Sequence, residues 1–235
     1  MAEIYLIRHA QASFGTADYD RLSELGNRQA EVLGQYLHGC AIQFDAIYSG
    51  ELRRQQETAR IAIEQLPTEV QCQADARLNE IESDKMFEHL VPQLVRSNPR
   101  LEALVAEGKT SSKQFQKALE IVFNQWVVTD ETYAGLQSWN DYSADVANVL
   151  GEIVAREGSG KTVGVFTSGG TIATIVAHVL GATGEQVYKL YEPLINCSVT
   201  RLLYSGSKIS LSSFNDHVFI RSLAENTGEP LLTYR

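Results

Sequence analysis

The stretch GVFTSGGTIATIVA at residues 164–177 has the pattern of a buried strand, a tight turn and the first turns of a helix. The apolar residues before Ser168 predict the strand, and those after Gly170 predict the helix. The first N–H groups of a helix have no partner within the helix, so a turn of this kind is suited to binding an anion. Ser168 is a candidate for three roles: a nucleophile, a ligand of a phosphate group, or a helix cap.

Strands of the same kind recur along the chain, with helical patterns between them. The predicted strands are EIYLI (3–7), FDAIYS (44–49), EVQCQA (69–74) and TVGVF (162–166). Strands that alternate with helices are typical of a parallel sheet with helices on both faces. The pattern therefore predicts an α/β fold, a three-layer sandwich around a mostly parallel sheet.

Two segments depart from this alternation. Residues 84–134 contain Pro92 and Pro99 and end in a helical pattern, which predicts a helical, cap-like insertion. The stretches CSVTRLLYS and KISLSSF flank Gly206-Ser207 and predict an antiparallel hairpin at the C-terminal edge of the sheet. We expect residues 1–235 to form a single domain that includes the insertion.

The composition disfavours several classes of function. The chain of 235 residues carries a formal net charge of −9 and has a pI of about 5.1, which disfavours binding to nucleic acid or to anionic lipid. Cys40, Cys72 and Cys197 show neither a metal-binding pattern nor a disulfide framework, as is usual in the cytoplasm. The sequence contains no run of about 18 apolar residues, so we expect no membrane span. We expect neither a metal nor a cofactor.

Reactive side chains follow three of the predicted strands. Arg8 and His9 come directly after the first, SGELRRQQET (49–58) after the second and Ser168 after the fourth. Ligands of open α/β sheets bind at the carboxyl ends of the strands, so these segments should meet. A histidine nucleophile must be neutral, and nearby cations such as Arg8 and Arg54 would lower its pKa. The same arginines would hold a phosphoryl group through paired hydrogen bonds, which makes His9 a candidate phosphoryl acceptor. Taken alone, the Arg-His dipeptide is more typical of a strand end without a catalytic role.

Several segments, in order, resemble the histidine phosphatase superfamily, also called the phosphoglycerate mutase-like family. These segments are LIRHAQ (6–11), LSELGNRQA (22–30), IYSGELRRQQETA (47–59), RLNEI (77–81), VFTSGGTIA (165–173) and NCSVTRLLY (196–204). The resemblance covers most of the chain apart from the 84–134 insertion. It implies a phosphatase that acts on a phosphomonoester through a phosphohistidine, without a metal.

The resemblance also implies a role for each matched residue. His9 would accept the phosphoryl group, Arg8 and Arg54 would hold it, and Glu80 would protonate the leaving oxygen and then help to activate water. Glu82 is the alternative proton donor, because the segment after Glu80 lacks the glycine that is common there in the family. The further candidate phosphate ligands are Ser168, Gly169, Gln11 and Ser13.

Ser168 stands where the family has its second histidine. Losing one preorganised donor at an anion site lowers a rate by about 10²–10³-fold, so the resemblance implies a slow or adapted phosphatase. The alternative is a non-catalytic module that keeps the arginines and binds a phosphorylated ligand. A mutase is disfavoured because re-phosphorylation should need the complete site. A serine nucleophile is also disfavoured, because the pattern G-x-S-x-G would require glycine at Phe166.

The substrate would be a phosphorylated small molecule or a phosphoprotein. Its identity would depend on the 84–134 insertion, in which no motif points to a particular ligand. The oligomeric state does not follow from the sequence either.

Overall fold

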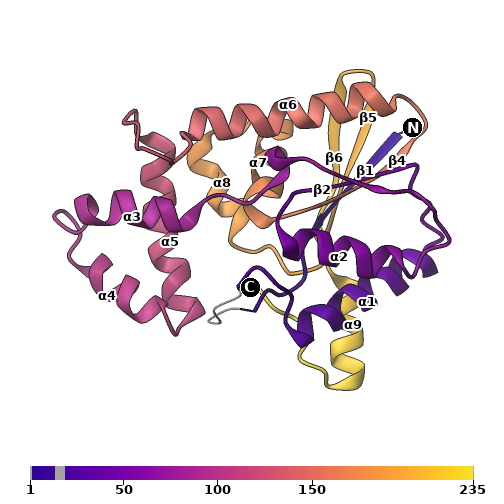
Figure 1. Ribbon diagram of the computed structural model, residues 1–235, viewed down its shortest axis with the longest axis horizontal. Helices are drawn as coiled ribbons and strands as arrows, with labels where there is room; N and C mark the ends of the chain where they lie inside the picture. Colours follow the sequence, from indigo (N-terminus) through magenta and orange to yellow (C-terminus); the bar gives the residue numbers. More distant parts are fainter. Residues whose placement is uncertain (1, 14–18, 235) are drawn as a thin grey trace.

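The computed structural model describes residues 2–13 and 19–234 (Figure 1). Its strands are β1 (Ala2–Arg8), β2 (Ala46–Ser49), β3 (Cys72–Ala74), β4 (Thr162–Thr167), β5 (Val199–Ser205) and β6 (Lys208–Asp216). Its helices are α1 (Glu24–Gly39), α2 (Arg53–Ile63), α3 (Ser83–Leu94), α4 (Arg100–Gly108), α5 (Ser112–Val128), α6 (Trp139–Glu157), α7 (Gly169–Leu180), α8 (Gly184–Tyr191) and α9 (Val218–Thr227). A short 3-10 helix lies at Ala76–Leu78.

The strands form one six-stranded sheet in the order β3-β2-β4-β1-β5-β6. The first four in this order run parallel to one another, whereas β5 is antiparallel to β1 and β6 is antiparallel to β5. The predicted α/β fold with a mostly parallel sheet and an antiparallel C-terminal pair is therefore confirmed.

Successive side chains of β1 point to opposite faces of the sheet and enter two separate cores. Ile4 and Leu6 lie in the core under α6, α7 and α8, and Tyr5 and Ile7 lie in the core under α1, α2 and α9. Figure 1 shows these two groups of helices on opposite faces of the sheet. Because β1 is buried on both faces, its residues 4–7 form a continuous apolar run and do not alternate with polar residues.

The helical insertion consists of α3, α4 and α5 and extends beside the sheet (Figure 1). The apolar face of α5 includes Phe123 and Trp126, which belong to the same core as α6 and α7. The helix predicted near the end of the insertion corresponds to α5, whereas α3 and α4 are additional. The insertion is thus packed onto the main core, and the single domain over residues 1–235 stays a prediction.

Two helices outside the insertion were not predicted, because few of their residues are buried. In α8 the buried residues are Val187 and Tyr188, and in α9 the buried residue is Ile220. So few apolar positions leave only a weak helical period in the sequence. Across the described ranges, no helix combines the length and the apolar character that crossing a membrane requires.

Candidate active site

The carboxyl ends of β1 and β4 bring together the predicted segments that contain Arg8-His9 and Ser168. Arg8 pairs with Thr167 across the two strands, and the N–H of His9 donates to the carbonyl of Thr167 at 2.8 Å. Ser168 follows Thr167 directly, so it lies next to His9 at the start of α7. Arg54 lies in the first turn of α2, the helix that follows β2. Because β2 pairs with β4, this turn lies beside the other two segments.

Four of the predicted residues line a common cavity of about 490 Å³: Arg8, His9, Arg54 and Glu80. They come from three separate stretches of the fold, namely the end of β1 with the residue after it, α2, and the loop before α3. The predicted convergence at this edge of the sheet is therefore present in the structure.

The imidazole of His9 is held through both ring nitrogens, and its Nε2 is unprotonated. Its Nδ1 lies 2.7 Å from the carbonyl oxygen of Ala10, which can only accept, so Nδ1 carries the hydrogen and Nε2 has a lone pair. The Nε of Arg54 donates a hydrogen bond to that Nε2 at 3.3 Å. Burial lowers the pKa of His9 well below its usual value, and the charges of Arg54 and Arg8 lower it further. The arginines were predicted to have this effect, but burial is the larger cause.

The backbone around His9 is fixed by side chains from distant segments. Asn196 donates from Nδ2 to the carbonyl of His9 at 2.9 Å, and the N–H of Ala10 donates to Oγ1 of Thr58 at 2.9 Å. The Thr58 hydroxyl in turn donates to the carbonyl of Arg54 at 2.7 Å. This chain ties the turn after β1 to α2, so His9 and Arg54 keep their relative position.

Arg8 is held differently from what paired binding of a phosphate would require. Its Nη1 donates to the carbonyl of Leu194, and its Nη2 donates to the carbonyl of Tyr234 at 2.8 Å. Its Nε is buried and has no hydrogen-bond partner within the described residues. In this conformation each terminal nitrogen of Arg8 already makes one hydrogen bond to the backbone, and its Nε–H is available to an anion.

Arg54 has a carboxylate partner that the sequence analysis did not identify. Its Nη1 forms an ion pair with Oδ1 of Asp20 at 2.5 Å, and its guanidinium lies over the ring of Tyr19. The aspartate neutralises part of the charge of Arg54 and fixes its direction. No motif pointed to Asp20, because its pairing with Arg54 depends on a contact across the fold.

Glu80, the predicted proton donor, lines the cavity and is held by two backbone N–H groups. Its Oε1 accepts from the N–H of Gly170 at 2.9 Å and from the N–H of Ile81 at 3.0 Å. Burial raises the pKa of Glu80 above its usual value, against the opposing effects of Arg54, those two N–H groups and Arg8. A Cβ atom at residue 170 would collide with this oxygen, so the approach requires glycine.

Glu82, the alternative donor, is more exposed. Its Oε1 forms an ion pair with Nζ of Lys85 at 2.6 Å, and nearly half of its side chain is exposed. The geometry therefore favours Glu80 over Glu82.

Ser168 begins α7 without capping it. Its hydroxyl oxygen accepts from Nε2 of Gln55 at 2.8 Å, and no side-chain cap bond is present at this helix N-terminus. Gln55 also donates to the carbonyl of Leu78 at 3.0 Å, and Gln55 and Ser168 are both fully buried. Gln55 was missed by the sequence analysis, although it directly follows Arg54 in a segment already singled out.

The other predicted phosphate ligands lie beside the cavity rather than in its wall. A Cβ atom on Gly169 would meet the ring of Tyr191 and approach Nε of Arg8. The side chain of Gln11 accepts from Ser23, the N-cap of α1, and Ser13 is held through its backbone N–H by the carbonyl of Arg21. Phosphate binding by Ser168, Gly169, Gln11 and Ser13 stays a prediction.

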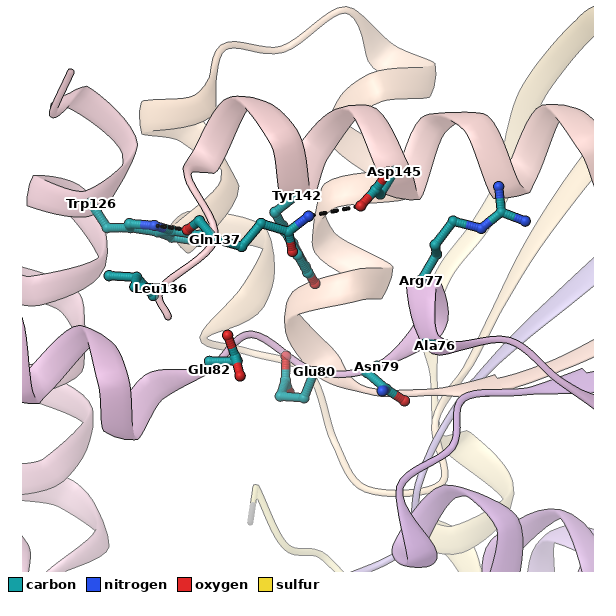
Figure 2. Close-up of a pocket in the computed structure, with 10 residues that line it drawn as sticks. All are labelled: Ala76, Arg77, Asn79, Glu80, Glu82, Trp126, Leu136, Gln137, Tyr142 and Asp145. Atoms are coloured by element: carbon teal, nitrogen blue, oxygen red, sulfur yellow. Dashed lines mark hydrogen bonds between the residues drawn. The ribbon is translucent and has the colours of Figure 1, made fainter. Parts of the chain in front are cut away.

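A second, smaller cavity of about 250 Å³ lies on the other side of the loop that carries Glu80 (Figure 2). Figure 2 shows Glu80 and Glu82 on this loop facing Gln137 and Tyr142 across the cavity. The hydroxyl of Tyr142 lies 3.0 Å from that of Thr171. Burial raises the pKa of Tyr142, and the charge of Glu80 raises it further.

No cluster of three or more histidine, cysteine or acidic side chains that could hold a metal occurs within residues 2–13 and 19–234.

Comparison with known proteins identifies the family. The model of the histidine phosphatase superfamily (branch 1) matches residues 4–104 and 102–217, and the chain belongs to this family. A search of curated proteins by sequence gave no match.

Solved structures show the same fold at low sequence identity. Phosphoserine phosphatase from Entamoeba histolytica, solved with phosphoserine, is 22% identical over 92% of this chain and 98% of its own, with a TM-score of 0.62. Mycobacterial glucosyl-3-phosphoglycerate phosphatase with inorganic phosphate is 23% identical over 93% and 99%, with a TM-score of 0.66. Phosphoglycerate mutase from Bacillus anthracis is 19% identical over 93% and 94%, with a TM-score of 0.64.

Proposed function

We propose that the protein is a phosphatase that hydrolyses a phosphomonoester through a phosphohistidine at His9. The observation that carries this proposal is the neutral His9 ring, whose unprotonated Nε2 lies in the cavity beside Arg54. A buried imidazole with a lowered pKa remains a nucleophile at neutral pH and below. The phosphatases of similar fold give independent support for this class of reaction.

The first step transfers the phosphoryl group to the protein. The lone pair of His9 Nε2 attacks phosphorus, the bond from phosphorus to the ester oxygen breaks, and the proton of Glu80 passes to that oxygen. The guanidinium of Arg54 and the Nε of Arg8 stabilise the charge on the other phosphoryl oxygens. The raised pKa of Glu80 favours the protonated form that this step needs.

The second step releases phosphate. Water attacks phosphorus, its proton passes to the Glu80 carboxylate, and the bond from phosphorus to Nε2 breaks. Glu80 thereby regains its proton and His9 its lone pair. No metal or cofactor is needed at any point in this sequence of bonds.

The competing function is a module that binds a phosphorylated ligand without turning it over. Ser168 supports this alternative, because its hydroxyl is fully buried and already bonded to Gln55. In either case, we propose a phosphorylated small molecule or phosphoprotein as the ligand and the cytoplasm as the compartment. A mutase is disfavoured because re-phosphorylation should need the complete site, and Ser168 stands where the family has its second histidine.

Rapid-quench kinetics with p-nitrophenyl phosphate distinguishes the two functions. We expect a burst of nitrophenol of up to one equivalent per protein, together with an acid-labile, base-stable phosphoprotein. Saturable binding of inorganic phosphate with neither burst nor turnover would instead support the binding module.

Replacing Ser168 with histidine should raise kcat only when the side chain of Gln55 is also shortened. In Ser168→His the larger imidazole would meet the amide of Gln55, which lies 2.8 Å from the present hydroxyl, so kcat should not rise. In Ser168→His with Gln55→Ala, the imidazole gains room to donate to the phosphoryl group, and kcat should rise about tenfold or more. Gln56→Ala, an exposed position on the same helix, is the matched control. An equal rise in the single Ser168→His variant would contradict this account.

A further inference from the structure

The cavity continues beyond the phosphate-binding groups, and this outer part must receive the alcohol portion of a substrate. Its wall comes from the loop before α3 and the first turn of that helix, from α5 and from the end of α8. Resting on the phosphatase function proposed above, we infer that the substrate's alcohol portion is partly apolar and carries no negative charge. Esters such as phosphoglycerate, which carry a carboxylate, are then poor substrates.

The apolar character comes from several elements that meet at the outer cavity. Leu119 of α5 and Ile81 are almost completely buried, and both line the cavity. Phe115, one turn before Leu119, and Tyr191 at the end of α8 add aromatic surface to the same wall. An apolar ligand surface placed against these side chains gains about 25 cal/mol for each Å² removed from water.

The charges of the outer cavity are predominantly negative. Glu82 and Asp84 both line it, and both are exposed to solvent. Apart from Arg8 and Arg54, Lys85 is the cation among the described lining residues, and it is already paired with Glu82 at 2.6 Å. This leaves Asp84 without a neutralising charge in the wall, so the outer cavity has a net charge of one negative unit.

The two arginines do not supply a second anion site. Arg54 is paired with Asp20, and Arg8 donates from both terminal nitrogens to backbone carbonyls. We assign their remaining N–H donors to the phosphoryl group itself. A carboxylate on the alcohol portion would therefore lie near Asp84 and Glu82 without a cation of its own, and like charges at this range disfavour binding.

Two esters of nearly equal shape test this inference: 4-carbamoylphenyl phosphate and 4-carboxyphenyl phosphate. We expect kcat/KM to be about tenfold higher for the uncharged carbamoyl ester at low salt, with most of the difference in KM. Raising the ionic strength to about 0.5 M should reduce the ratio, because exposed charges are screened. Equal values, or a preference for the carboxylate, would overturn the inference.

Charge variants show whether the acidic wall is the cause. Asp84→Asn with Glu82→Gln removes both carboxylates and frees Lys85, so the preference for the carbamoyl ester should vanish or reverse. Glu88→Gln, an exposed acidic position on the same helix outside the cavity wall, should keep it. An unchanged ratio in the double variant would also overturn the inference.

The test separates this inference from the proposed function. If neither ester is hydrolysed, the phosphatase proposal fails. Calorimetric titration of His9→Ala with the two esters still decides the inference, since the expected ratio of dissociation constants is again about tenfold. Equal affinities in that titration would refute the acidic-wall account.

Discussion

Replacing His9 with alanine should abolish hydrolysis of p-nitrophenyl phosphate, lowering kcat by at least about 10⁴-fold, the scale seen when a nucleophile is removed. The physical reason is that, in the proposed mechanism, Nε2 of His9 is the atom that receives the phosphoryl group. The burst of nitrophenol and the acid-labile phosphoprotein should disappear together with turnover.

A matched control makes this result specific. His89 of α3 stacks on Tyr133 away from the cavity, so His89→Ala should leave kcat within about twofold, as for surface positions remote from a site. Thermal unfolding of both variants shows whether the fold is kept. Residual activity of a tenth or more in a folded His9→Ala protein would rule out His9 as the phosphoryl acceptor.

Replacing Glu80 with glutamine should produce the second largest loss of activity. The size of this loss should depend on the leaving group of the ester. A poor leaving group such as an alkyl alcohol needs the proton, so its kcat/KM should fall by about 10²–10⁴-fold, the usual contribution of a general acid. The phosphorylation step with nitrophenyl phosphate should fall much less, because nitrophenolate leaves without a proton. Steady-state and single-turnover rates with both esters measure the difference.

The pH dependence of the same step follows from the direction of the pKa shift. Burial raises the pKa of Glu80, so the protonated donor persists above the usual range of a glutamate. For an alkyl ester, kcat/KM should fall as the pH rises through this elevated pKa, and Glu80→Gln should lose that limb of the profile. His9 should not add an ionisation to this part of the pH profile, because its lowered pKa keeps the ring unprotonated over the same range.

Glu82→Gln decides between the two candidate donors. The ion pair of Glu82 with Lys85 and its exposure indicate that it does not donate the proton. The variant should therefore keep both the leaving-group dependence and the pH limb of the parent protein. If these features were lost in Glu82→Gln and kept in Glu80→Gln, the assignment of the donor would be wrong.

The central elements of the fold were predictable because their signals are local. β1, β2 and β4 are short apolar runs that end at polar residues, and α7 is an apolar helix that ends at Gly181. A strand that is buried on both faces of a sheet is a nearly continuous apolar run, so it can be recognised from residue type alone. α3 and α4 were not predicted individually, since each buries few side chains and Pro92 lies inside α3.

The sequence by itself determined which chemistry is available: a histidine directly after a buried strand, an arginine after each of two strands and an acidic residue before the insertion. Those signals are short, contiguous stretches of sequence, so they can be recognised without knowledge of the fold. Only the tertiary structure decided how these groups are held, because Asp20, Asn196 and Tyr234 act on them across large separations in the chain. Burial, which is also a property of the folded chain, makes the ring of His9 neutral and Glu80 easier to protonate.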